Sequence, residues 1–183
     1  MDDSTTEKEW RNFAKTIDGT IEKSDANYFD RDNKFKISTK TSEIDLTWGN
    51  QPQRGRGPFV TLETNIRYTL NINYKIEFRV SPNDLFSKIF SSLSSKKQKF
   101  GIKELDQSYL LKCNTPNIAF ELKEIFTEFH KFNKYKNFVI EIENISDSLT
   151  LTIFIPELIK TQEKLSLYYN FGLELSKKIS ANT

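Results

Sequence analysis

The sequence predicts an α+β fold, in which a mostly antiparallel sheet or sheets carry helices packed on one face. Pairs of segments with alternating apolar residues indicate hairpins. Segments with apolar residues at helical spacing lie between these pairs. The expected order is a helix, two pairs of strands, a helix, a strand, a helix, a pair of strands and a helix. Because the strands come in consecutive hairpins, antiparallel pairing is favoured over parallel pairing.

The chain of 183 residues is long enough for one domain with a buried core. Charged residues make up 28% and hydrophobic residues 37%, which is a polar composition for a folded protein. The 15 Phe and 7 Tyr nevertheless supply a large buried area per residue. We therefore expect a folded core, with short disordered ends at Met1–Thr6 and Ala181–Thr183.

The first expected element is a helix over "STTEKEWRNFAKTIDG". Its apolar residues recur at helical spacing, at Trp10, Phe13, Ala14 and Ile17. Asp18 and Gly19 form a suitable stop. The segments "KFKIST" and "EIDLTW" follow, and their alternation predicts the first pair of half-buried strands.

The next segment, "WGNQPQRGRGP", concentrates glycine and proline and predicts a connection between strands. A phosphate-binding loop is excluded, because the spacing from Gly49 to Gly55 is too long, no Lys follows, and a strand comes next. Arg54 and Arg56 supply a single Arg-Gly copy, whereas nucleic-acid contacts of this kind need repeats or interleaved aromatics. The segment is therefore interpreted as a solvated connection.

The strongest pattern is an unbroken alternation in which every even position from Val60 to Val80 carries an apolar residue, tyrosine or threonine. One strand of this length would exceed the typical ~3–10 residues, so a hairpin is expected. A loop with an odd number of residues keeps the even positions on one face. Taking Asn71–Asn73 as a three-residue loop pairs Leu70 with Tyr74 and Ile66 with Phe78.

A helix is expected to follow over "SPNDLFSKIFSSL", with Ser81 as N-cap, Pro82 at the first helical position and Asp84 at the third. Its apolar stripe is Leu85, Phe86, Ile89, Phe90 and Leu93. The polar Ser/Lys link "SSLSSKKQK" then marks the best boundary within the chain. We expect a single domain over 1–183, and sub-halves over 7–93 and 98–180 that represent two related sheet-plus-helix units remain an alternative.

The second part of the chain begins with an expected strand over "ELDQSYLLKCN", after which Thr115 and Pro116 open a long helix. The stripe of that helix is Ile118, Leu122, Ile125, Phe126 and Phe129. A hairpin follows over "NFVIEIEN" and "SLTLTIFI", with a loop at Asn144–Asp147 that places Ile142 opposite Leu149. Pro156 ends the second strand and Thr161 caps the final helix, whose stripe is Leu165, Tyr168, Phe171, Leu175 and Ile179.

Several phrases in this order resemble a family of small uncharacterised bacterial proteins. They are "EWRNFAKTIDGTI", the alternating "RYTLNINYKIEF", the helix phrase "LFSKIF", and the run Leu105–Asn114 before a long helix. The similarity in order and spacing extends from Trp10 to the last helix. Two departures are Leu105, where the family has an aromatic residue, and "GIKE", which replaces an acidic-Gly-Asp lead-in. The resemblance implies one intact α+β unit and no established activity, and it transfers no catalytic residue.

The charge and cysteine content favour a cytoplasmic protein. The net charge of +2 comes from 27 basic and 25 acidic residues that are interspersed, which argues against a general affinity for nucleic acid or anionic lipid. Cys113 is the single cysteine, so no intrachain disulfide forms, as suits a reducing compartment. No apolar run approaches the roughly 20 residues that span a bilayer. The segment "MDDSTTEKEW" is the opposite of a secretory signal.

The residues that carry catalytic or metal chemistry are sparse. One His and one Cys cannot form a Cys/His zinc site, and a Cys113–His130 nucleophile–base pair is disfavoured because Cys113 lies in an apolar strand. The group Asp25, Asp30 and Asp32 fails as a Ca²⁺ loop and is interpreted as turn-forming. We expect no enzyme activity, no cofactor and no metal.

Three function classes follow. The first hypothesis is a non-enzymatic cytoplasmic domain that binds an unknown protein partner or itself through an apolar patch, with no membrane partner. The second is a small-molecule carrier with an apolar cavity between sheet and helix, lined by Ile66, Tyr68, Ile76, Phe78, Tyr168 and Phe171. The third, which the charge balance disfavours, is weak RNA binding through a basic patch formed by Lys96, Lys97, Lys99, Lys131, Lys134 and Lys136.

Overall fold

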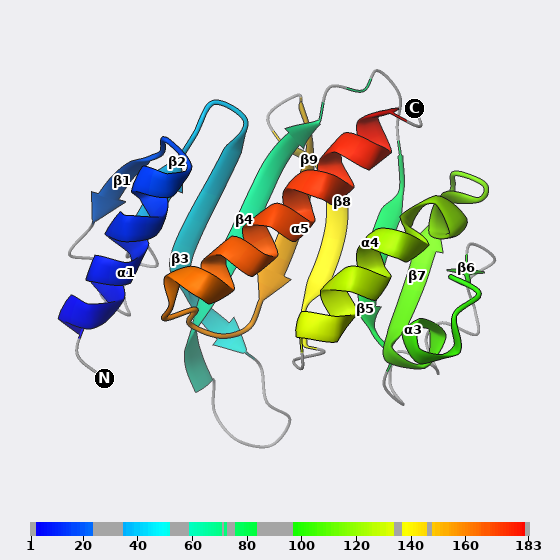
Figure 1. Cartoon of the computed structure of the whole chain (residues 1–183), viewed down its shortest axis with the longest axis horizontal. Coiled ribbons are helices and arrows are strands. Elements are labelled where there is room, and N and C mark those ends of the chain that lie inside the picture. Colours follow the sequence, from blue (N-terminus) through cyan, green and yellow to red (C-terminus); the bar gives the residue numbers. More distant parts are fainter. Residues whose placement is uncertain are drawn as a thin grey trace. The chain divides into compact units, whose positions relative to one another are not determined.

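The computed structural model describes residues 3–23, 35–51, 59–70, 72, 76–83, 97–133, 137–145 and 148–181 (Figure 1). Within these residues the helices are α1 (Asp3–Thr16), α3 (Lys103–Ser108), α4 (Ile118–Phe132) and α5 (Gln162–Ala181). The strands are β1 (Thr20–Lys23), β2 (Phe35–Ser38), β3 (Ser42–Gln51), β4 (Phe59–Leu70), β5 (Phe78–Pro82), β6 (Lys97–Gln98), β7 (Tyr109–Cys113), β8 (Val139–Ile145) and β9 (Ser148–Ile155). The predicted α+β class is confirmed.

The strands form a nine-stranded antiparallel sheet in the order β1-β2-β3-β4-β9-β8-β5-β7-β6. The first predicted hairpin is present, since β2 pairs with β3 and Ile37 lies opposite Ile44. The second is present too, because β8 and β9 are neighbours. Strand β8 runs to Ile145, so the connection is shorter than the predicted loop at Asn144–Asp147. Strand β1 was not predicted.

The predicted pairing of the long alternating segment with itself is wrong. In the sheet, β9 and β8 lie between β4 and β5. Strand β5 instead pairs with β7, where Phe78 lies opposite Cys113, and with β8. The alternation correctly marks the buried side of both strands, because Ile66 and Phe78 are buried. A period of two defines which face a residue occupies, but it carries no information about the neighbouring strand. The predicted loop at 71–73 lies outside the described residues apart from position 72.

Three element boundaries also differ from expectation. The segment predicted as one strand over Glu104–Asn114 begins as helix α3 and becomes strand β7 only at Tyr109. Ser81 and Pro82 belong to strand β5 and therefore do not open a helix; the rest of that predicted helix lies outside the described residues. Helix α1 begins at Asp3, so the predicted disordered end is helical from that residue onward.

The chain packs as two compact units, each made of two chain segments. Unit 1 comprises residues 1–67 and 154–170, and unit 2 comprises residues 68–153 and 171–183. Both β4 and α5 contribute to each unit. The units therefore do not follow the polar Ser/Lys link, and the single domain and its sub-halves over 7–93 and 98–180 stay predictions. None of the described helices has the length and apolar character that crossing a bilayer requires.

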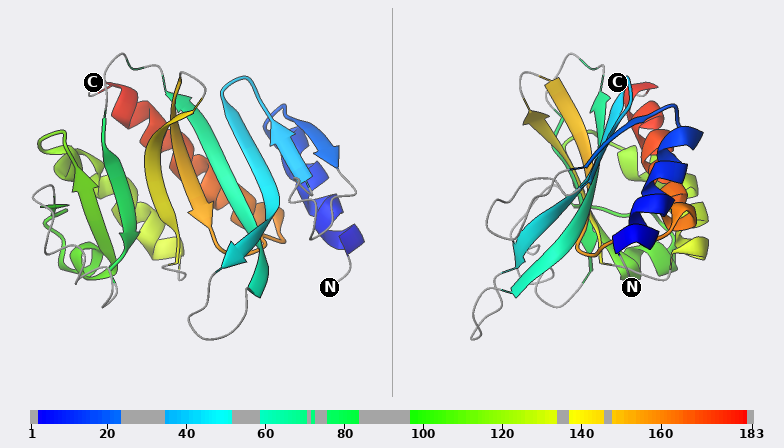
Figure 2. Two further views of the ribbon diagram at one scale, coloured as in Figure 1. Left: turned by 180° about the vertical axis from the view of Figure 1, so that it is seen from behind. Right: turned by 90° about the vertical axis from the view of Figure 1, so that its left-hand side faces the viewer.

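In unit 1, helix α1 covers one face of strands β1 and β2 (Figure 2). The predicted stripe provides this contact, because Trp10, Phe13 and Ala14 are buried. The indole ring of Trp10 packs 5.7 Å from the ring of Phe35, and its Nε1 donates a hydrogen bond of 2.9 Å to the Ile159 carbonyl. The ring is packed and its N–H is hydrogen-bonded, so Trp10 joins the first helix to the segment that contains Ile159.

The residues of unit 1 that alternate with this core carry a polar network. Asp45 is buried. Its carboxylate accepts a hydrogen bond of 3.0 Å from Asn65 Nδ2 and forms an ion pair with Arg67. Glu43 lies 2.8 Å from Lys36 Nζ and 3.5 Å from Arg67. The buried carboxylate is thus fully compensated, as a buried charge has to be.

In unit 2, helix α4 covers one face of β5, β7 and β8 and lies beside the second part of α5 (Figure 1). The core between them is aromatic. Phe129 stacks on Phe171 with ring centres 3.8 Å apart, and Phe138 meets both rings edge-on. Gly172 allows a close approach, because a Cβ atom there would lie 2.7 Å from Ile153 Cδ1 and closer still to the Tyr68 ring.

Helix α5 agrees with its predicted start and its predicted buried face. The Thr161 hydroxyl accepts a hydrogen bond of 3.3 Å from the Lys164 amide, which is the expected N-cap contact. Strand β9 ends at Ile155, directly before Pro156. Every residue of the predicted stripe is buried, namely Leu165, Tyr168, Phe171, Leu175 and Ile179.

Candidate functional site

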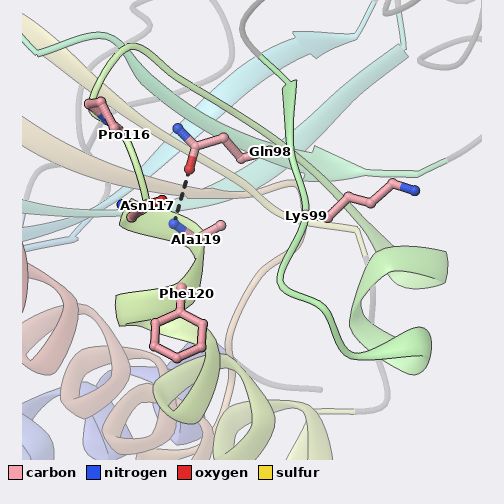
Figure 3. Close-up of a pocket in the computed structure, with 6 residues that line it drawn as sticks. All are labelled: Gln98, Lys99, Pro116, Asn117, Ala119 and Phe120. Carbon is pink, nitrogen blue, oxygen red and sulfur yellow. Dashed lines mark hydrogen bonds between the residues drawn. The ribbon is translucent and has the colours of Figure 1, made fainter.

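A pocket of ≈ 390 Å³ lies in unit 2 where strand β6 meets the first turn of helix α4 (Figure 3). It is lined by Gln98, Lys99, Pro116, Asn117, Ala119 and Phe120. These residues come from two segments, the end of β6 and the start of α4. None of them was predicted as a cavity-lining residue, and Lys99 was predicted only as part of a basic patch.

The start of α4 is shaped by Asn117. Its backbone adopts a left-handed conformation with φ of 62°, which asparagine tolerates better than most residues. Its carbonyl accepts hydrogen bonds from the amides of Phe120 (3.0 Å) and Glu121 (3.2 Å). Pro116 precedes it and cannot continue a regular hydrogen-bond pattern. The chain therefore turns sharply between β7 and α4, and α4 begins at Ile118, three residues after the predicted helix start at Thr115.

The side chain of Gln98 fastens the two walls of the pocket together. Its Nε2 donates a hydrogen bond of 2.6 Å to the Thr115 carbonyl and one of 3.4 Å to the Cys113 carbonyl. Its Oε1 accepts a hydrogen bond of 3.2 Å from the Ala119 amide, which is drawn in Figure 3. A glutamine amide has both donor and acceptor capacity, so one side chain satisfies the connecting turn and the open helix end.

The pocket presents an aromatic ring and a cation to solvent. Phe120 is 61% exposed, and Lys99 is also exposed. Lys123 Nζ lies 3.7 Å from the centre of the Phe120 ring, in a cation–π contact. Phe132, at the other end of α4, is 70% exposed. These two are the large hydrophobic residues that lie exposed within the described part of the chain.

The predicted basic patch is divided between two places. Lys97 and Lys99 lie at β6, beside the first turn of α4, because Gln98 between them contacts Ala119. Lys131 lies in the last turn of α4, where its Nζ is 2.6 Å from Glu128. The twelve residues from Ala119 to Lys131 correspond to about 18 Å of helix. Lys96, Lys134 and Lys136 lie outside the described residues.

The side chains predicted to line an apolar cavity are all buried: Ile66, Tyr68, Ile76, Phe78, Tyr168 and Phe171. Phe171 is enclosed by the aromatic core of unit 2, and Tyr68 approaches Gly172 too closely for an additional methyl group. At these two residues the space is filled by side chains. The carrier cavity itself stays a prediction.

Cys113 and His130 do not form a pair. The two residues lie at opposite ends of strand β7. His130 lies near its first residue, since His130 Nδ1 is 3.3 Å from the hydroxyl of Tyr109. Cys113 stands four residues further along β7, or about 13 Å. Its Sγ accepts a hydrogen bond of 3.3 Å from the Thr115 amide. Burial raises the pKa of the Cys113 thiol and raises that of Tyr109 to about 12, so both groups are held in their neutral forms.

The pocket was missed because it depends on a long-range contact. Gln98 belonged to the expected polar link, and no local pattern connects it with Ala119, 21 residues later. One signal was readable in the sequence. Phe120 and Phe132 lie outside the predicted apolar stripe of their helix, and an aromatic residue off the stripe indicates exposure.

The comparisons with known proteins add no relative. The chain matches no protein-family model, and no curated protein or solved structure matches it significantly. The resemblance to a bacterial family therefore stays a prediction, and the pocket has to be interpreted from its own geometry.

Proposed function

We propose that the protein is a non-enzymatic cytoplasmic interaction domain that binds a protein partner, or a second copy of itself, through the β6–α4 surface. This surface is defined by Gln98, Lys99, Pro116, Asn117, Ala119 and Phe120. The observation that carries the proposal is the 61% exposure of Phe120 beside the pocket. Burying such a side chain is worth about 1.5–3 kcal/mol. Aromatic side chains are enriched in the buried centres of protein interfaces.

The fixed geometry of the surface supports the same proposal. Gln98 holds the β6 segment and the first turn of α4 with hydrogen bonds of 2.6 Å and 3.2 Å. A site whose walls are already held in place loses little conformational entropy when a partner binds. Binding energy from Phe120 is then available for affinity.

A non-enzymatic role is supported by the location of the groups whose pKa is shifted. Tyr109 and Cys113 are shifted by burial in the core of unit 2, and neither lines the pocket. The pKa of Glu7 is lowered by its hydrogen bond to Lys23 and by its contact with Arg11, and it lies in helix α1 of unit 1. No acid, base and nucleophile converge among these groups, whereas an active site would bring them together.

The test is native mass spectrometry of the protein purified gently from its own cells, as wild type and as the variants Phe120→Ala and Phe132→Ala. We expect the wild type to carry a second protein chain or to form a homodimer, and Phe120→Ala to lose it. Phe132→Ala is the matched control, since it removes an even more exposed ring from the other end of the same helix, away from the pocket. A bare monomer for the wild type, or equal loss in both variants, would contradict the proposal.

A small-molecule carrier is the second candidate, because the β6–α4 surface holds an open depression of ≈ 390 Å³. It predicts an excess mass of a few hundred daltons on the monomer that Phe120→Ala removes. The RNA-binding alternative has less support, because helix α4 separates Lys131 from Lys97 and Lys99.

A further inference from the structure

We infer that the partner of the β6–α4 surface is an extended acidic peptide segment of another protein, which adds to strand β6 with alternating acidic and apolar side chains. This inference rests on the proposed interaction function and names the class of partner. It combines three observations: the strand edge at β6, a row of cations on neighbouring strands, and the exposed ring of Phe120.

Strand β6 is an edge of the sheet. It pairs with β7, with Lys97 opposite Lys112 and Gln98 opposite Leu111, and in the described part of the chain it ends the strand order. The backbone N–H and C=O groups on the outer side of an edge strand are available to an added strand. Peptide recognition by strand addition uses such an edge together with a neighbouring pocket for side chains.

The two faces of the sheet at β6 differ in character. The Gln98 side chain reaches Thr115 and Ala119 at the start of α4, so it lies on the face that bears the helix. Lys97, its neighbour, points to the opposite face because side chains alternate along a strand. There, Lys97 lies opposite Lys112, and Lys112 lies opposite Arg79 on β5.

This arrangement forms a row of three cations on adjacent strands. Arg79 lies 3.2 Å from Glu141 on β8, which leaves Lys112 and Lys97 as the cations toward the edge. An added strand would place one side chain directly beside Lys97. A carboxylate at that position is favoured, and a like charge is disfavoured, because directly opposed side chains on paired strands interact.

The helix-bearing face offers both polar and apolar groups. Beside Gln98, the pocket offers Pro116, Ala119 and the ring of Phe120. Lys99 is the single charged residue among the lining residues, and Glu121, next to Phe120, is directed to Lys178 at 3.5 Å. Glu124 lies a further turn along the helix. A strand with apolar residues on this face and acidic residues on the other matches both sides.

The same charges argue against a second copy at this edge. Antiparallel pairing of β6 with its own equivalent, with the faces of the two sheets aligned, would bring Lys97 of one copy beside Lys97 of the other, with a Lys112 one strand behind on each side. Like charges placed directly opposite each other destabilise a strand pair. Self-association, if it uses α4, therefore does not proceed through paired β6 edges.

The test is an NMR titration of the ¹⁵N-labelled full chain with three short capped peptides, in which valine alternates with glutamate, glutamine or lysine. We expect the glutamate peptide to shift the amide signals of β6 and of the first turn of α4, with an affinity that falls as salt is added. The glutamine peptide should bind about two- to fivefold more weakly, and the lysine peptide more weakly still. The double variant Lys97→Glu/Lys99→Glu should reverse this preference, and Lys131→Glu should not alter it.

The outcomes separate this inference from the proposed function. Equal binding of the three peptides, shifts confined to another part of the chain, or an unchanged preference in the double variant would overturn the acidic-strand inference. Absence of binding by all three peptides would overturn it as well. The interaction function is decided independently, by whether a second protein chain or a homodimer depends on Phe120 in native mass spectrometry.

Discussion

Tyr109 shows how a single side chain links the core of unit 2 to pH. Its ring is buried among Phe126 and Phe138, with ring centres 5.8 Å and 5.4 Å away. Its hydroxyl lies 3.3 Å from His130 Nδ1. Burial disfavours the charged phenolate and raises the pKa of Tyr109 from 10.0 to about 12. The folded state therefore keeps a proton that the unfolded chain loses at lower pH.

This raised pKa predicts a loss of stability at alkaline pH. Below the unfolded pKa of about 10 the contribution is complete, and it declines as pH rises toward 12, because only the unfolded chain releases the proton. Between pH 9 and pH 11 the free energy of unfolding should fall by about 1 kcal/mol through this group. Urea unfolding at several pH values measures it. In Tyr109→Phe this part of the decline should be absent; an unchanged pH dependence would refute the assignment.

At the scale of elements, Gln98 connects a two-residue strand to a fifteen-residue helix. Strand β6 is too short to be stable by its own hydrogen bonds. The amide of Gln98 adds contacts to Thr115 and Ala119, so the position of α4 and that of the sheet edge depend on each other. This connection holds the two walls of the pocket to each other.

Gln98→Leu should loosen this connection while leaving the core intact. The substitution leaves the Ala119 amide and the Thr115 carbonyl without their partner, which costs about 1–3 kcal/mol when such groups are buried and less here, where they are part-buried. Hydrogen exchange of the Ala119 amide should accelerate, and exchange in the last turn of α4 should not. Lys97→Ala is the neighbouring control, with an expected change within about 0.5 kcal/mol. Uniform acceleration along α4 would argue against a local role for Gln98.

The elements also show what could be predicted from the sequence. The buried faces of α1, α4 and α5 follow from helical periodicity. Residues of each stripe, such as Trp10 and Leu165, are buried regardless of which elements pack against the helix. The N-cap at Thr161 and the helix stop near Gly19 were predictable because they depend on residues close together in the sequence. The neighbours of β5 were not predictable, because burial of Phe78 is satisfied equally beside β4 or β7. The pocket was not predictable for a similar reason, because it depends on the long-range contact between Gln98 and Ala119.

At the scale of the whole molecule, the two units share elements. The boundary falls within β4, after Arg67, within β9, after Ile153, and within α5, after Asn170. A helix is a cooperative structure, because each residue adds a hydrogen bond to a turn already formed. A disturbance in the middle of α5 is therefore expected to reach both units.

Asn170→Pro tests this coupling. Asn170 is exposed, so the change acts through the backbone, where an interior proline costs about 3 kcal/mol or more. Fluorescence of Trp10 reports on unit 1, and hydrogen exchange in α4 reports on unit 2. Both should lose stability by the same amount, and Asn170→Ala should be neutral or slightly stabilising. Loss confined to one unit would show that the units unfold independently.

The composition of unit 1 has a consequence for synthesis on the ribosome. Residues 1–67 leave the exit tunnel before residues 154–170, which their unit also needs. Until those residues emerge, the indole N–H of Trp10 lacks the Ile159 carbonyl, and the apolar stripe of α1 lacks part of its cover. The nascent chain therefore has to carry an incomplete core in unit 1 until residues 154–170 have emerged. Chaperones that bind exposed apolar segments would meet α1 early, and residues 154–170, rather than residues 1–67, complete the fold of unit 1.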